Sequence, residues 1–174
     1  MKILFLVIGG LAVLIALLWL IGSRLPRSHH ATSRIRLTQP PEAVWPVVRS
    51  LEAVSGWWPE VKRSVRLADQ AGLQRYEHTL DNFAMILLVT EDQPPQLLRT
   101  TIDSPPGAPF GGSWIYDLTP SGTGTVLQVT EEGWIDNPFF RLMAGMMGFH
   151  RTLDSYLTAL AKRMGDAATL EHSP

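Results

Sequence analysis

The 174-residue chain has no cysteine and almost no net charge, with 15 lysine and arginine residues against 16 aspartate and glutamate residues. The lack of thiols excludes disulfides, thiolate catalysis and cysteine-bound zinc, but it does not identify the compartment. No basic stripe appears, so nucleic acid is not an expected partner. The HExxH, GxSxG, P-loop and GxGxxG patterns are also missing, and we predict no catalytic motif, no metal site and no cofactor.

The first feature that is present is an uncharged run of twenty residues, 3–22, made mostly of Leu, Ile, Val and Ala. As a helix it would span roughly 30 Å, the thickness of the hydrocarbon core of a bilayer. We predict a transmembrane anchor, with a cleaved signal peptide and a buried core helix as alternatives. The run is longer than the apolar part of a signal peptide, and no A-x-A-like cleavage site follows it.

The charges around the run predict an orientation and a division of the chain. Lys2 precedes the run, whereas Arg24, Arg27, Arg34 and Arg36 follow it. Positive residues favour the cytoplasmic side, so we expect a single-pass membrane protein whose soluble part faces the cytoplasm. We expect a juxtamembrane linker over 23–30, one domain over 31–165 and a flexible tail over 166–174.

Short apolar or alternating runs separated by turn residues predict an antiparallel sheet. The expected strands are 31–37, 61–67, 73–80, 83–90, 97–102, 113–118 and 126–130. Two short helical segments lie between the first and second strands and end before Trp57-Trp58-Pro59. Apolar residues at three- and four-residue steps from Phe139 to Met164 predict one long amphipathic helix that ends at Gly165.

This order of elements resembles the helix-grip fold of the START/Bet v 1-like superfamily, SRPBCC, and within it the polyketide cyclase/dehydrase branch. The resemblance covers about 33–163. It rests on Ile35 to Leu37 followed by Pro40-Pro41-Glu42-Ala43-Val44-Trp45, on Trp57-Trp58-Pro59, Trp114-Ile115-Tyr116-Asp117-Leu118 and Gly124-Thr125, and on Thr130-Glu131-Glu132-Gly133 with Asn137-Pro138.

The resemblance implies an α+β fold, in which a curved seven-stranded antiparallel sheet wraps around the C-terminal helix and encloses an apolar cavity. Members bind lipids, sterols, hormones or polyketides, and a minority catalyse; they share no catalytic motif, so no catalytic residue is carried over. The candidates for the cavity wall are mostly aromatic residues and methionines. They are Trp57, Trp58, Tyr76, His78, Met85, Trp114, Tyr116, Met143, Met146 and His150.

The polar candidates each have a structural alternative. Tyr76 and His78 share one face of a strand, which is either the concave face or the outer one. His150 lies on the apolar stripe of the long helix, where it either contacts a ligand or is a core histidine paired with the backbone. Glu131 and Glu132 are interpreted as solvated residues at a strand end, with at most one facing inward.

Three functions remain open at this point. The leading hypothesis is a membrane-anchored binding protein for an apolar small molecule such as a lipid, an isoprenoid quinone or a polyketide-like ligand. The second is a polyketide cyclase or dehydratase that uses Tyr76, His78 and His150 in acid–base roles, which requires that they converge on one cavity. The third is an interaction module of a membrane complex, which predicts a filled core and a large exposed apolar patch.

Overall fold

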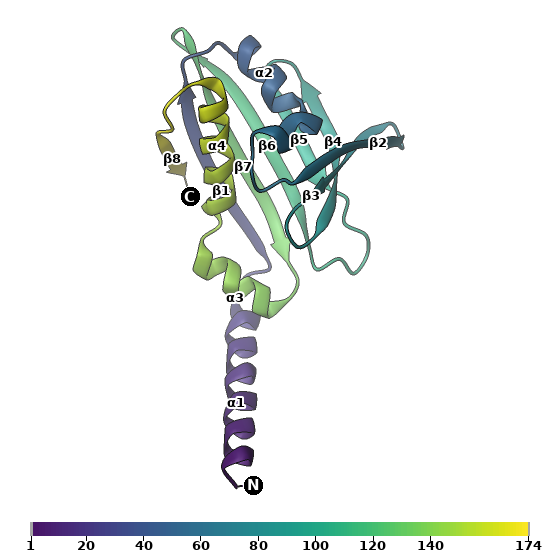
Figure 1. Ribbon diagram of the computed structural model, residues 1–174, viewed down its shortest axis with the longest axis vertical. Coiled ribbons are helices and arrows are strands. Elements are labelled where there is room, and N and C mark those ends of the chain that lie inside the picture. The colour runs from purple at the N-terminus through teal and green to yellow at the C-terminus, as the bar shows by residue number, and fades with distance from the viewer. Residues whose placement is uncertain (1, 174) are drawn as a thin grey trace.

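The computed structural model describes residues 2–173, which form one sheet with helices on one face and a separate N-terminal helix (Figure 1). The helices are α1 (Lys2–Arg24), α2 (Pro41–Arg49), the short 3-10 helix η1 (Leu51–Gly56), α3 (Pro138–Met147) and α4 (His150–Met164). The strands are β1 (Ser28–Leu37), β2 (Arg63–Gln70), β3 (Leu73–Thr79), β4 (Ala84–Gln93), β5 (Leu97–Ile102), β6 (Phe110–Ser121), β7 (Gly124–Ile135) and β8 (Leu170–Ser173).

The sheet is antiparallel and has the strand order β2-β3-β4-β5-β6-β7-β1-β8. The predicted meander is therefore confirmed from β2 to β7, and β1 closes back against β7. The sheet has eight strands rather than the predicted seven, because Leu170–Ser173 pairs with Thr32–Ile35 of β1. The segment was expected to belong to a frayed tail, but pairing with the free edge of β1 satisfies its backbone groups.

The core lies between the concave face of the sheet and α4. Ser33, Ile35 and Leu37 face inward from β1, while Arg36 is exposed on the other side, as the alternation predicts. From α4, Leu153, Leu157 and Leu160 are fully buried against this face, and α2 and η1 cover its other end. Each leucine stabilises the fold by about 1.5–3 kcal/mol through apolar burial.

The single C-terminal helix predicted from the periodicity is interrupted at Gly148 and Phe149. Gly148 has a φ of 82° and donates its N–H to the carbonyl of Ala144, which ends α3. Residues with a Cβ rarely adopt this backbone conformation, so the glycine at position 148 permits the break. The apolar periodicity continues through the break and conceals it in the sequence.

We predict opposite effects from alanine at the two glycines near this break. Gly145 lies inside α3 with nothing within 4 Å of an added Cβ, so Gly145→Ala should stabilise the protein by up to about 1 kcal/mol. Gly148→Ala should destabilise it by about 1 kcal/mol or more because of the positive φ. Chemical denaturation of both variants checks this, and a stabilising Gly148→Ala would contradict the assigned backbone break.

Helix α1 projects away from the sheet, and its C-terminal end contacts α3 (Figure 1). It is long and apolar enough to cross a membrane and is not packed in the core, so the core-helix alternative is wrong. A signal sequence meets the same criterion. The expected linker over 23–30 is shorter than predicted, because β1 begins at Ser28 and includes both His29 and His30.

Candidate functional site

Five aromatic rings meet between the concave face, the segment after η1 and α4. Ring-centroid distances between neighbours run from 5.3 to 6.0 Å, and several pairs are edge-to-face, an arrangement that the aromatic quadrupole favours. Four of the rings were predicted from the sequence. The cluster consists of Trp57, Trp58, Trp114, Tyr116 and Tyr156.

The cluster is partly open and carries no charge. Trp58 is buried and its indole N–H donates to the Ser155 hydroxyl at 3.1 Å, whereas Trp57 and Trp114 are half-buried. Burial raises the pKa of the Tyr116 hydroxyl far above its ordinary value, although a hydrogen bond with Thr100 opposes the shift. Burial likewise raises the pKa of Tyr156. Both phenols therefore stay neutral at physiological pH.

Tyr76 and His78 face the concave side from β3, and both are buried. Met85 on β4 lies opposite His78 and is half-buried. The Nε2 atom of His78 is buried and has no hydrogen-bond partner among the residues that the structure describes. Burial lowers the pKa of His78 to about 4, a shift opposed by a hydrogen bond to the Leu51 backbone. The imidazole is therefore neutral at pH 7.

His150 lies at the start of α4, in a different place. Its Nδ1 is 3.2 Å from the Ser33 hydroxyl, which donates to Asp154 at 2.8 Å. His172 of β8 is 2.9 Å from the same carboxylate, and its ring lies 4.5 Å from that of His150. These four side chains link α4, β1 and β8 to one another. The Nδ1 atom of His150 is therefore hydrogen-bonded within the protein and is not available to a ligand in the core.

The predicted acid–base residues do not come together. Four strands, β4 to β7, separate Tyr76 and His78 on β3 from β1, where His150 is attached. Met143 and Met146 also lie outside the aromatic cluster, because α3 points its methionines outward and packs against α1. The structure thus places seven of the ten predicted residues on the concave face or against it from the segment after η1. Met143 and Met146 lie outside this region on α3, and His150 lies at the start of α4 against Ser33 of β1.

One polar pair on the concave face was not predicted. His29 Nε2 lies 3.1 Å from a carboxylate oxygen of Glu131, and the His29 ring stacks on Phe149 with centroids 4.3 Å apart. Glu131 lies opposite Trp114 on β6, whereas Glu132 points outward to Arg99. Extending the alternation of Ile35 upstream and of Val129 downstream places both residues inward, so the signal was present in the sequence.

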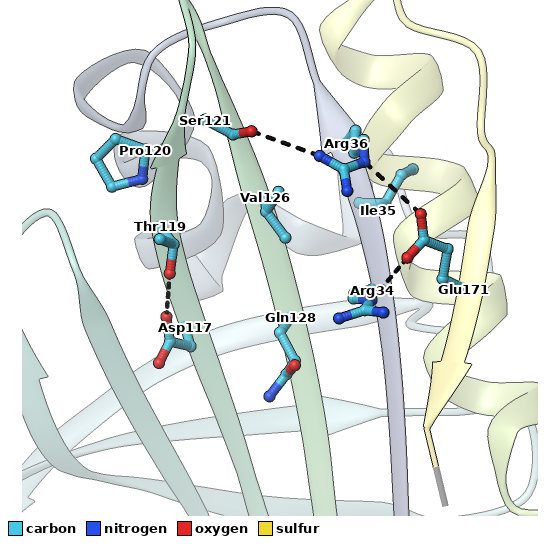
Figure 2. Close-up of a pocket in the computed structure, with 10 residues that line it drawn as sticks. All are labelled: Arg34, Ile35, Arg36, Asp117, Thr119, Pro120, Ser121, Val126, Gln128 and Glu171. Carbon is cyan, nitrogen blue, oxygen red and sulfur yellow. Dashed lines mark hydrogen bonds and ion pairs between the residues drawn. The ribbon is translucent and has the colours of Figure 1, made fainter.

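Two pockets lie on the surface, outside the core between the sheet and α4. The first, of about 360 Å³, lies on the outer side of β1, β6 and β7 and is lined by Arg34, Arg36, Asp117, Gln128 and Glu171 among others (Figure 2). The Glu171 carboxylate forms ion pairs with both arginines there, at 2.8 Å from Nε of Arg34 and 3.6 Å from Nε of Arg36. The second, of about 450 Å³, is formed by residues 28–30 and 132–134. Among residues 2–173, no group of three or more metal-ligating side chains is arranged to hold a metal ion.

Known structures share this fold at low sequence identity. A START superfamily protein from Mycobacterium smegmatis matches with a TM-score of 0.62 and 20% identity, over 79% of this chain and 97% of that one. The Zhui aromatase/cyclase from Streptomyces sp. R1128 matches with a TM-score of 0.63 and 15% identity, over 79% and 94%. The chain spans about half of the di-domain aromatase/cyclase StfQ of the steffimycin pathway, at 11% identity, a TM-score of 0.64 and coverage of 79% and 52%.

These structural similarities establish the fold, and a match to a sequence family establishes which proteins the chain is related to. No protein with a curated description matches the sequence. The family described as "Polyketide cyclase / dehydrase and lipid transport" matches residues 28–165, which run from the start of β1 to the glycine that ends α4. The resemblance inferred from the sequence motifs is thereby confirmed: the chain belongs to the polyketide cyclase/dehydrase and lipid transport family.

Proposed function

We propose that the protein is a membrane-anchored binding protein for an apolar small molecule, such as a lipid, an isoprenoid quinone or a polyketide-like compound. The observation that carries this proposal is the aromatic cluster on the concave face, where Trp57 and Trp114 remain partly exposed. Apolar and aromatic walls with few polar groups are typical of small-molecule sites. Family membership supports the same class of function.

The proposed ligand surface extends from the aromatic cluster across the neighbouring strands. Met85 and Ile102 are half-buried, and they lie opposite His78 and Leu87 respectively, which places them on the inward face. The flexible side chain of Met85 is the one we expect to move when a ligand binds. That movement would give a ligand hydroxyl or carbonyl access to the unpaired Nε2 of His78.

The anchor belongs to the same proposal. Helix α1 would hold the binding site next to the phase in which apolar ligands dissolve, which raises the effective ligand concentration. We propose a single-pass arrangement with the domain in the cytoplasm. Four arginines follow the apolar run closely, whereas Lys2 is the one basic side chain before it, and basic residues favour the cytoplasmic side.

Native mass spectrometry of the full chain from nonionic detergent tests the ligand site. We expect an apolar adduct on the wild type and on Trp134→Ala, which removes a half-buried tryptophan on the outer face. Trp57→Ala should lower adduct occupancy on the order of tenfold, since it removes an exposed wall of the site. A lipid held by α1 would persist in all three proteins, so equal occupancy in all three, or no adduct at all, would contradict the proposal.

A second candidate, polyketide cyclase-type chemistry, is favoured by the His29–Glu131 pair. An imidazole and a carboxylate 3.1 Å apart beside Trp114 suit proton transfer to a ligand in a largely apolar setting. The structural similarity to an aromatase/cyclase supports the same class. The same mass measurement separates the two functions, because catalysis changes the mass or fragmentation of an added polyketide-like compound. Glu131→Gln should then prevent the change and leave binding intact.

A further inference from the structure

Helix α3 is unusual for a helix of a soluble domain, because none of its ten residues, all of which the structure describes, is buried. Its five largest exposed apolar side chains have exposed fractions between 42% and 81%. Contiguous exposed apolar surface of this kind marks a site that another phase or molecule covers. These side chains are Phe139, Phe140, Met143, Met146 and Met147.

The position of α3 indicates what covers it. Pro138, its first residue, packs so closely on Gly22 that a Cβ at residue 22 would overlap the Pro138 carbonyl. Arg141 donates to the backbone carbonyl of Leu25 at 2.7 Å, just beyond the end of α1. Helix α3 is therefore fixed at the level where the apolar run of α1 stops. If α1 spans a bilayer, this level is the boundary between acyl chains and headgroups.

A second apolar group lies at the same end of the sheet. The rings of Phe83 and Phe110 meet edge-to-face with centroids 5.6 Å apart, and Phe83 is 45% exposed. Phe110 lies opposite Ile135, three residues before α3 begins. In Figure 1 the β3–β4 and β5–β6 connections point toward the end from which α1 projects. Phenylalanines at this level suit the interface of a membrane.

The charged residues that flank α3 and the end of α1 are mainly basic. Arg141 is the only charged residue of α3. Arg24 and Arg27 follow the apolar run, and Arg27 also pairs with Asp136, the acidic residue closest to α3 in the sequence. Basic residues beside an apolar helix face favour binding to anionic phospholipids.

We propose that α3, together with Phe83 and Phe110, forms a membrane-contact surface that lies in the lipid interface and holds the domain against the bilayer that α1 spans. The inference rests on the anchoring part of the proposed function. A protein partner would also cover apolar side chains, but it would not require them to lie level with the end of α1. The contact also places one end of the concave face toward the bilayer, which would shorten the path of an apolar ligand from the lipid (Figure 1).

Depth-dependent fluorescence quenching tests the proposal, and the absence of native cysteine makes single labelling sites simple to introduce. Three full-length variants, Met146→Cys, Leu14→Cys and Thr158→Cys, would carry an NBD label in liposomes of phosphatidylcholine and phosphatidylglycerol. Met146 is 81% exposed on α3, Leu14 lies within the apolar run, and Thr158 is exposed on α4. Phospholipids with doxyl groups at shallow or deep positions serve as quenchers.

We expect the shallow quencher to lower the fluorescence of the label at residue 146 by about twofold and to leave the label at residue 158 unquenched. The label at residue 14 should respond most to the deep quencher. Quenching at 14 with none at 146 would overturn the contact surface and leave the anchor standing. No quenching at 14 would contradict the anchor itself. A label at 146 that is shielded only in native membranes, and not in these liposomes, would identify a protein partner and overturn the lipid assignment.

Discussion

Replacing Trp58 with alanine is expected to lower the free energy of unfolding by about 3–5 kcal/mol. Trp58 is 5% exposed, and its ring lies 5.3 Å from that of Tyr156 and 5.8 Å from that of Trp114. The substitution removes this packing, leaves a cavity beneath α4 and deprives the Ser155 hydroxyl of its donor. All three effects destabilise the native state.

Urea denaturation of the full chain in mild detergent, followed by the circular dichroism of the sheet, measures this loss. Trp58→Phe should lose less, since a ring remains in the cluster, although the hydrogen bond to Ser155 is removed. Trp19→Ala is the matched control, because Trp19 lies 57% exposed on α1 and contacts no part of the core cluster. A loss of less than about 1 kcal/mol for Trp58→Ala would show that the cluster does not stabilise the domain.

The second large effect expected is a dependence of stability on pH caused by His78. Its pKa is about 4 in the folded protein, against 6.5 for an unperturbed histidine, because burial penalises the charged ring. Between these values the unfolded chain binds a proton that the native state does not, so stability falls as the pH drops from about 6.5 to about 4. At about 1.4 kcal/mol per pH unit the loss amounts to about 3 kcal/mol, and it is complete once the native state is protonated as well.

Thermal unfolding at several pH values, read by tryptophan fluorescence, isolates this contribution when the wild type is compared with His78→Leu. The variant should lose less stability on acidification than the wild type, because it has no imidazole at this buried position. His30→Gln provides the control, since His30 is exposed on the outer face of β1. Identical pH dependence in the wild type and His78→Leu would contradict a buried neutral histidine.

Local patterns in the sequence were sufficient for most of the fold. The alternation around Ile35 predicted β1 and its buried face, and turn residues between short apolar runs predicted the antiparallel meander. The same alternation, extended upstream from Ser33 through Ala31, would have placed His29 on the inward face. What the pattern concealed was the break at Gly148, because the apolar steps continue through it and only the backbone torsion marks it.

The sequence by itself determined the composition of each face and the apolar length of α1, because these depend on residues close together in the chain. The order of such local patterns along the chain was enough to indicate the family. Tertiary structure alone decided which residues meet. The contact between His29 and Glu131 joins positions 102 residues apart, and strand order separates His150 from His78 by four strands. Contact between distant residues depends on strand register and sheet curvature. Both are determined by the packing of the whole core, and neither can be read from the local periodicity of apolar residues.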